Sequence, residues 1–156
     1  MIKIITGKHD SGKTSYLRYL VKDSKFFSGF LEYKKYDENG EFVGYELYNI
    51  ETGEKFDFIT TDLSKKGKRV KDFVILKEGL EMGKKIIEEG IKKDKILVID
   101  EVGQIQVQEK LFHNEIVKAI NSDTEIYITV SKELLNDFLM KYNLKNRDYN
   151  LIKVDY

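Results

Sequence analysis

The sequence predicts a three-layer α/β fold in which a mostly parallel sheet carries an inserted antiparallel meander. Short apolar runs alternate with segments of helical period, as in proteins whose sheet has helices on both faces. The run Ile96–Ile99 is continuously apolar, as expected of a strand buried on both faces. Residues 26–59 lack the helical period and are rich in Phe and Tyr. Because the 156 residues show no linker or repeat, we expect one domain over residues 1–156.

The N-terminal segment is interpreted as strand, loop and helix. Ile2–Thr6 is a short apolar run that ends at Gly7, which predicts a buried strand. The polar stretch Lys8–Gly12 predicts a loop. From Lys13 onward, apolar residues recur on one face of a helix: Tyr16, Leu17, Leu20 and Val21.

The aromatic stretch that follows contains hairpin signals. Asn39-Gly40 separates Gly29–Tyr36 from Glu41–Ile50, and Asn-Gly between two such runs is a strong hairpin signal. Thr52-Gly53 then separates the second run from Lys55–Ile59. We therefore expect a three-stranded antiparallel meander here.

The second half of the chain alternates helices and strands. We expect a basic loop over Ser64–Lys71, helices over Val74–Glu89 and Glu109–Asn121, and strands over Ile96–Ile99, Glu125–Val130 and Asn150–Val154. Ser131 is placed to cap a further helix that carries Leu134, Leu135, Phe138 and Leu139. This order predicts a parallel sheet, into which the meander is inserted.

Composition excludes several classes of function. Lys plus Arg and Asp plus Glu number 27 each, so the net charge is zero and gives no electrostatic case for nucleic acid as a partner. Without Cys, and with His9 and His113 as the two histidines, a bound metal would need oxygen ligands. No apolar run approaches the roughly 20 residues of a membrane helix, and no targeting segment is visible. We expect no membrane association and a cytoplasmic location; no protein partner is indicated.

A phosphate-binding motif follows the first predicted strand. Gly7-Lys8-His9-Asp10-Ser11-Gly12-Lys13-Thr14, called the phosphate loop below, fits the pattern G-x-x-x-x-G-K-[ST]. Gly7 and Gly12 permit backbone angles that a β-carbon forbids. The N–H groups of the loop then converge on a phosphate at the N-terminus of the next helix. Lys13 can reach the β- and γ-phosphates, and the Thr14 hydroxyl can ligate Mg²⁺. We expect the whole loop and Ser15 to contact a nucleoside triphosphate.

Two carboxylates follow the buried run Ile96–Ile99. A side chain at the end of such a strand projects toward the edge of the sheet where ligands bind. Asp100 is placed to hold Mg²⁺, usually through water. Glu101 is placed to orient or deprotonate an attacking water. Together with the phosphate loop, this pair predicts Mg²⁺-dependent chemistry on a triphosphate.

These segments resemble the nucleoside-triphosphatase family of P-loop proteins first known from thermophiles. The resemblance rests on the phosphate loop, on Gly29-Phe30 with the later Val43-Gly44-Tyr45-Glu46-Leu47, and on Val98-Ile99-Asp100-Glu101-Val102-Gly103. The last is similar to the Asp-Glu-Ile-Gly segment of the family. The resemblance covers roughly residues 1–130 and implies a RecA-like P-loop fold with slow, broad hydrolysis of nucleoside triphosphates. Gln104 stands where the family usually has Lys, which implies weaker turnover.

We predict that the protein hydrolyses nucleoside triphosphates slowly and with Mg²⁺. The substrates are expected to include ATP and others such as GTP, and Lys13 and Glu101 are the expected catalytic residues. One alternative is a small nucleoside or cofactor kinase, against which the scarcity of Arg counts. Another is an ATP-binding switch module with little turnover.

Four further features leave two interpretations each. Arg18 is expected on the helix surface rather than in the site, and His9 at a solvent-facing loop tip rather than against a nucleotide. The basic loop 64–71 is expected to be a solvated loop rather than a lid over the phosphates. The tyrosines of the meander are expected to pack across strands rather than to stack on a ligand. They are Tyr33, Tyr36, Tyr45 and Tyr48.

Overall fold

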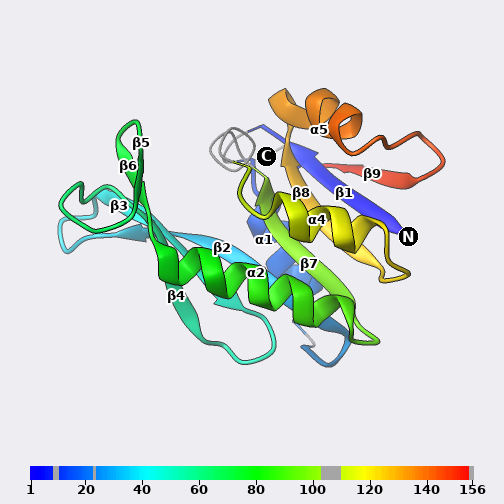
Figure 1. Cartoon of the computed structure of the whole chain (residues 1–156), viewed down its shortest axis with the longest axis horizontal. Helices are drawn as coiled ribbons and strands as arrows, with labels where there is room; N and C mark the ends of the chain where they lie inside the picture. The colour runs from blue at the N-terminus through cyan, green and yellow to red at the C-terminus, as the bar shows by residue number, and fades with distance from the viewer. Residues whose placement is uncertain (9–10, 23, 103–109, 155–156) are drawn as a thin grey trace.

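The computed structural model describes residues 1–8, 11–22, 24–102 and 110–154, apart from the side chains of Ser24, Glu101 and Val102. Within this part of the chain, nine strands form one sheet (Figure 1). They are β1 (Ile2–Gly7), β2 (Phe27–Tyr36), β3 (Phe42–Asn49), β4 (Lys55–Thr60), β5 (Lys68–Val70), β6 (Phe73–Ile75), β7 (Ile96–Val102), β8 (Ile126–Ser131) and β9 (Tyr149–Lys153). Their order across the sheet is β5-β6-β4-β3-β2-β7-β8-β1-β9.

The sheet has a parallel half and an antiparallel half that share β2. The pairs β2–β7, β7–β8, β8–β1 and β1–β9 are parallel. The pairs β2–β3, β3–β4, β4–β6 and β6–β5 are antiparallel. At the β2–β3 hairpin, the Gly40 amide donates to the Asp37 carbonyl over 3.0 Å, which closes the turn. The antiparallel strands are thus continuous with the parallel sheet.

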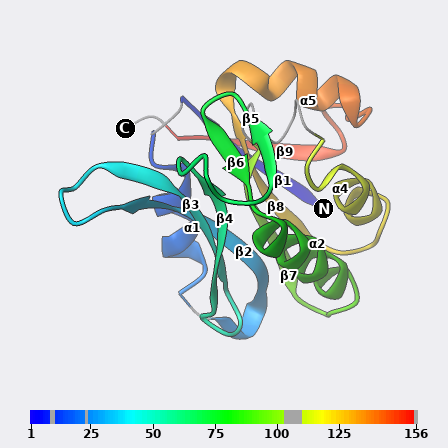
Figure 2. The ribbon, with the colours of Figure 1, turned by 60° about the vertical axis from the view of Figure 1, so that its left-hand side comes forward.

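Helices cover both faces of this sheet. They are α1 (Lys13–Leu20), α2 (Lys77–Ile91), α4 (His113–Ile120) and α5 (Leu135–Lys141), with the short 3₁₀ segments η1 (Ser24–Phe26) and η2 (Lys132–Leu134). Leu17 of α1 packs with Ile5, Val98 and Tyr127 on one face. Figure 2 shows α2 and α4 lying side by side, where they contact each other on the other face.

The core on the α2 side is the larger of the two. Ile87 of α2 and Ile116 of α4 belong to one buried cluster with Phe30, Leu97 and Ile99 of the sheet. Phe112 joins the cluster from the residue before α4, with its ring 5.5 Å from that of Phe30. Because buried side chains of both helices interlock with the middle strands, the central part of the sheet is held rigidly.

Among the helices of the described residues, none has the length and apolar character that a membrane crossing requires.

Several predicted boundaries were wrong. The helix expected from Val74 begins at Lys77, because Val74 and Ile75 are extended and buried in β6. Part of the loop expected over 64–71 is the strand β5, which pairs with β6. The four apolar residues Phe73–Leu76 directly before the helix fit either period, so the pattern could not separate the end of β6 from the start of α2.

The later elements also differ from the predicted ones. Ser131 is the last residue of β8 and makes no side-chain capping bond, because a 3₁₀ turn intervenes before α5. The helix expected from Glu109 begins at His113, and Glu109 itself lies outside the described residues. The last strand is shifted by one residue, to Tyr149–Lys153.

Candidate functional site

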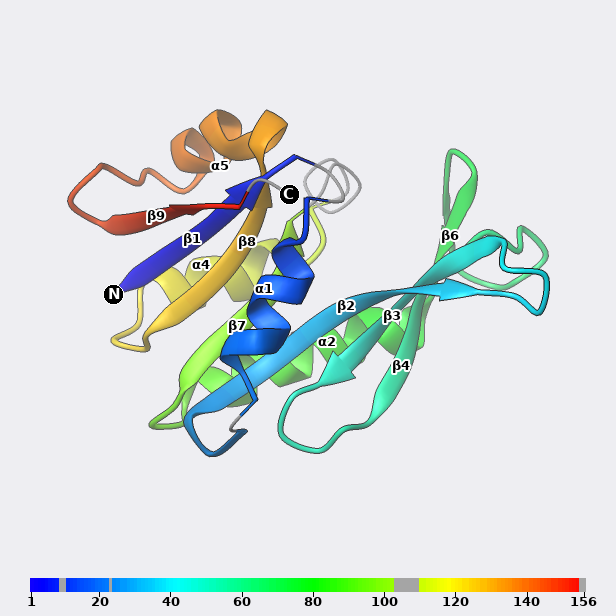
Figure 3. The same cartoon turned by 180° about the vertical axis from the view of Figure 1, so that it is seen from behind.

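The predicted site lies at the edge of the sheet where β1, β7 and β8 end. These strands are parallel, so their carboxyl ends meet there. β1 continues through the phosphate loop into α1, which crosses this part of the sheet (Figure 3). β8 lies between β1 and β7. The fold therefore brings the phosphate loop and the end of β7 to one place.

Gly7 ends β1 and Gly12 precedes α1, and both are positions where a side chain is disfavoured. Gly12 has a φ of 95° and is the N-cap residue of α1. A β-carbon on Gly7 would lie 2.2 Å from the Val154 carbonyl oxygen and 2.3 Å from the Ser11 hydroxyl. The Ser11 amide closes the loop by donating to the Lys8 carbonyl over 3.0 Å. Neither glycine can be replaced without moving the loop.

The Lys13 side chain folds back over the phosphate loop. Its ammonium donates to the Gly7 carbonyl over 3.2 Å and to the Lys8 carbonyl over 2.8 Å. Lys13 is only 3% exposed, so these carbonyl dipoles replace much of the water that the charge has lost. The Lys13 ammonium therefore lies at the N-terminus of α1. The helix N-terminus and the ammonium both favour the binding of an anion there.

Asp100 is the centre of a buried polar cluster. It is 1% exposed, and its Oδ2 accepts hydrogen bonds from the Thr14 hydroxyl and from the Glu32 amide, both over 2.9 Å. Its Oδ1 accepts a hydrogen bond from the Thr129 hydroxyl over 2.8 Å. Hydrogen bonds to a carboxylate stabilise its ionised form. The cluster therefore joins α1, β2, β7 and β8 through one carboxylate.

The Thr14–Asp100 pair fits the chemistry of Mg²⁺. Both side chains present oxygen atoms, the ligands that Mg²⁺ prefers, and they lie within hydrogen-bond distance of each other. No group of three or more His, Cys, Asp or Glu side chains within the described ranges could hold a metal. Mg²⁺ commonly uses one or two protein ligands together with substrate phosphates and water. The residues present therefore suit a metal that arrives with a phosphate ligand.

A pocket of about 300 Å³ opens beside the loop. Its lining comes from α1 and from the two strands β2 and β3: Ser11, Gly12, Lys13, Thr14, Ser15, Arg18, Glu32, Tyr33, Lys34 and Tyr45. Glu32 is a buried carboxylate in this lining. Burial raises the pKa of the Tyr33 hydroxyl above its usual range.

The sequence interpretation did not single out Glu32 and Lys34 as site residues, and for Tyr33 and Tyr45, which also line the pocket, it favoured packing over stacking on a ligand. Glu32 and Lys34 belong to a strand whose place beside β7 depends on the order of the sheet, which no local pattern reveals. Arg18, expected on the helix surface, is exposed but also lines the pocket, 5.9 Å from the centre of the Tyr33 ring. Among the tyrosines of the meander, Tyr33 and Tyr48 pack edge to face across β2 and β3, with ring centres 5.8 Å apart.

Some expected site residues lie outside the described part of the chain. They are His9, Asp10 and Gln104. The backbone of Glu101 belongs to β7, directly after Asp100, but its side chain is not described. Lys8 and Ser15 are described, and both are exposed.

The basic segment 64–71 lies at the other end of the sheet. Its residues 68–70 form β5, which is the edge strand farthest in sheet order from β1 and β9. Six strands lie between β5 and β1, and the seven spacings of nearly 5 Å give a separation of roughly 34 Å along the sheet. The segment therefore does not cover the phosphate loop in this structure.

One protein-family model matches nearly the whole chain. A family model described as NTPase matches residues 3–156. The chain belongs to this family. This family match supports hydrolysis of nucleoside triphosphates, and the chain is a P-loop enzyme of that class.

Curated relatives of the chain are also named as nucleoside-triphosphatases. The nucleoside-triphosphatase THEP1 of Thermotoga sp. (strain RQ2) is 26% identical over 145 residues, 93% of this chain and 80% of the relative. The nucleoside-triphosphatase THEP1 of Natranaerobius thermophilus is 28% identical over 132 residues, 83% of this chain and 75% of the relative.

Solved structures share the fold. The crystal structure of THEP1 from Aquifex aeolicus superposes with a TM-score of 0.76 at 22% identity, over 99% of this chain and 90% of the other. The solution structure of a human cancer-related nucleoside triphosphatase superposes with a TM-score of 0.72 at 18% identity, over 97% and 87%. The chain therefore has the P-loop fold of these proteins, with a mixed sheet.

Proposed function

We propose that this member of the NTPase family hydrolyses nucleoside triphosphates slowly, with Mg²⁺, and with little selectivity for the base. The observation that carries the proposal is the hydrogen bond of 2.9 Å between Asp100 and Thr14, the residue directly after the buried Lys13. It joins a phosphate-binding loop to a carboxylate that can hold a metal. The names of the relatives support the same reaction.

In this proposal each residue of the site has a separate role. The phosphate loop binds the triphosphate through its N–H groups and the N-terminus of α1. The Lys13 ammonium neutralises phosphate charge. Thr14 and Asp100 would hold Mg²⁺, which supplies charge stabilisation at the transferred phosphoryl group. Glu101 takes a proton from the attacking water, or orients it.

Slow turnover follows from the cations that the site offers. A well-placed Arg typically accelerates phosphoryl transfer by about 10³–10⁵. The chain has three Arg, and among them Arg18 lines the pocket, exposed and beside Tyr33. Gln104 also lacks the charge of the Lys that the resembling proteins usually carry. We therefore expect turnover below about 1 s⁻¹, since unassisted P-loop sites can be as slow as roughly 10⁻⁴–10⁻² s⁻¹.

Weak base selectivity follows from the binding groups. The contacts that the site offers to a triphosphate come from the phosphate loop, Lys13 and the metal, which all nucleoside triphosphates would share.

The RecA-like fold of the family that the sequence resembles is also part of the proposal. The position of the strand β8 between β1 and β7 supports it. A cytoplasmic location also stays a prediction.

One observation favours a second candidate, a small phosphotransferase. The pocket extends beyond Thr14 to Glu32, Tyr33 and Tyr45, and its 300 Å³ could admit a small acceptor. A kinase would transfer phosphate to that acceptor in place of water.

Phosphate release from ATP, GTP, CTP and UTP tests the proposal. We expect Mg²⁺-dependent release below about 1 s⁻¹ on all four, with rates within roughly a hundredfold of one another. Tens of turnovers per second on one nucleotide, with the others more than about a hundredfold slower, would contradict it. Rapid transfer to an added nucleoside or cofactor, in place of release, would assign the chain to the kinases.

A further inference from the structure

The two oxygens of the Asp100 carboxylate are held from different strands. Oδ1 accepts the hydrogen bond of the Thr129 hydroxyl on β8, at 2.8 Å. Oδ2 accepts those of the Glu32 amide on β2 and the Thr14 hydroxyl on α1, each at 2.9 Å. The carboxylate thus spans the space between both neighbours of β7, with Oδ2 directed toward the phosphate loop.

This bridging occurs where β7 leaves its regular pairing. The parallel register of β7 with β2 ends at Ile99–Phe30. The register of β7 with β8 runs to Ile99–Ile128 and then shifts before Val102–Val130. Asp100 lies in this interruption. Its side chain therefore accepts hydrogen bonds from both neighbouring strands at the place where the β7 ladder breaks.

Thr129 is completely buried, with an exposed fraction of 0%, so its hydroxyl is shielded from competing water. A hydrogen bond to a charged acceptor in a buried place is shorter and stronger than one in water. It fixes the rotation of the carboxylate about its last bond. Without it, Oδ1 would lose its donor from β8 and the carboxylate could turn away from Thr14.

We propose that Thr129 is a positioning residue, which orients Asp100 so that Oδ2 faces Thr14 and a metal bound with the nucleotide. The inference rests on the proposed function because it concerns the same metal. Residues that orient metal ligands typically change metal affinity by about 10–100-fold when they are removed. The loss should therefore appear in Mg²⁺-dependent nucleotide binding, before any chemistry.

Calorimetry on the full chain with a non-hydrolysable ATP analogue tests this inference. The ratio of affinities measured with Mg²⁺ and with a chelator reports the contribution of the metal. In Thr129→Val, which keeps the shape but lacks the hydroxyl, we expect this ratio to fall about 10–100-fold. The affinity without Mg²⁺ should stay within about threefold, since the phosphate loop is intact.

Two further variants separate positioning from packing. Thr129→Ser keeps the hydroxyl, so its ratio of affinities with and without Mg²⁺ should stay within about threefold of the wild-type ratio. Thr129→Ala differs from the Ser variant only by the hydroxyl, and its ratio should fall as far as that of Thr129→Val. The Ser and Ala pair also gives the answer if Val does not fold. Thr124→Val is a matched control, since its hydroxyl donates to the Ile91 carbonyl over 2.9 Å in the turn before β8.

The outcomes are distinct from those of the proposed function. The inference would be overturned if Thr129→Val and Thr129→Ala had the same ratio of affinities with and without Mg²⁺ as the wild type. It would also be overturned if the ratio fell equally in Thr129→Ser and Thr129→Ala, or if Mg²⁺ did not raise the affinity of the wild type. A wild type that shows the Mg²⁺ ratio and its dependence on the hydroxyl, but releases no phosphate, would support the inference and contradict the proposed function.

Discussion

Lys13 and Asp100 are charged side chains that the fold buries almost completely, with exposed fractions of 3% and 1%. Taking a charge out of water costs several kcal/mol unless other groups replace the solvent. Carbonyl groups of the phosphate loop do so for Lys13, and hydroxyl and amide donors do so for Asp100. Both charges are therefore already oriented before a nucleotide arrives, which reduces the reorganisation needed on binding.

The identity of the general base can be tested on two carboxylates. We expect Glu101→Gln to keep nucleotide binding and to lower kcat by about 10²–10⁴, because the amide cannot accept a proton from water. Glu32→Gln, a matched change in the lining of the pocket, should lower kcat by less than about tenfold. Single-turnover phosphate release with both variants measures this. A larger loss in Glu32→Gln than in Glu101→Gln would transfer the role to Glu32.

Residues of the site differ in how far a sequence can predict them. Gly7, Gly12, Lys13 and Thr14 belong to one continuous motif, so local spacing is enough to place them together. Thr129 could not be found in this way, because its meeting with Asp100 depends on β8 lying beside β7. When the order of strands in the sheet brings two residues together, no local periodicity of the sequence indicates their contact.

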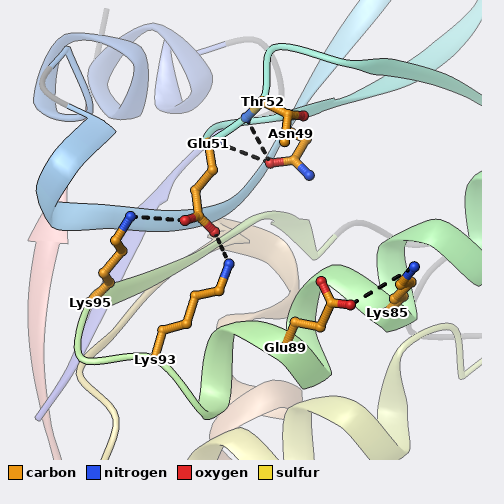
Figure 4. A network of polar contacts seen from close by, with 7 residues as sticks. All are labelled: Asn49, Glu51, Thr52, Lys85, Glu89, Lys93 and Lys95. Carbon is orange, nitrogen blue, oxygen red and sulfur yellow. Dashed lines mark hydrogen bonds and ion pairs between the residues drawn. The ribbon is translucent and has the colours of Figure 1, made fainter.

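Between elements, one polar network ties the turn after β3 to the segment between α2 and β7 (Figure 4). The Glu51 carboxylate contacts the ammonium of Lys93 at 2.5 Å and that of Lys95 at 2.8 Å. Burial by itself would raise the pKa of Glu51, but hydrogen bonds and charge from the two lysines outweigh it and lower the pKa. The network fastens the antiparallel half of the sheet to the parallel half at the end away from the phosphate loop.

This network should make stability depend on pH in a defined direction. Since the pKa of Glu51 is lower in the folded chain than its ordinary value of 4.5, its contribution is present above pH 4.5 and is lost as pH falls through the folded pKa. We expect Glu51→Gln to lower the free energy of unfolding by about 0.5–1 kcal/mol near neutral pH, with the difference shrinking in acid.

Urea unfolding at about pH 7 and in steps toward about pH 3 measures this difference. Glu89→Gln is the matched control, since Glu89 meets Lys85 within α2 at 3.9 Å and both side chains are more than half exposed. Its change should stay within about 0.5 kcal/mol. A Glu51→Gln difference that grows in acid would have the wrong sign and would contradict the assignment.

The elements could be predicted where their period was unambiguous. The hairpin at Asn39-Gly40 carried a two-residue turn signal, and β2 and β3 pair antiparallel around it. The strands β5 and β6 are three residues each, too short for alternation to be counted against a helical period. Their pairing with each other and with β4 is a tertiary effect, which overrides local preference.

Across the whole molecule, nucleotide binding should stabilise the fold by mass action. A ligand at a hundred times its Kd adds about 2.7 kcal/mol, which for a domain of this size raises Tm by roughly 5–10 °C. We expect Mg²⁺ with any of ATP, GTP, CTP or UTP to give similar shifts, because the shared triphosphate supplies the binding energy.

Thermal unfolding followed by circular dichroism measures these shifts without depending on turnover. Lys13→Ala should abolish them, while Lys84→Ala, an exposed lysine on α2, should leave them unchanged. A shift with one nucleotide and none with the other three would reveal a pocket that reads the base. An undiminished shift in Lys13→Ala would contradict the assignment of the phosphate loop.

The place of β1 in the sheet also dictates when the site can form during folding. β1 is the first strand in sequence, yet its neighbours are β8 and β9, and Ile2 pairs with Ile126 and Tyr149. During synthesis, the phosphate loop therefore emerges from the ribosome more than a hundred residues before the strands that hold it. Loop closure over such a distance is slow compared with local pairing. The β2–β3 hairpin can form early, whereas nucleotide binding must be among the last properties that the nascent chain acquires.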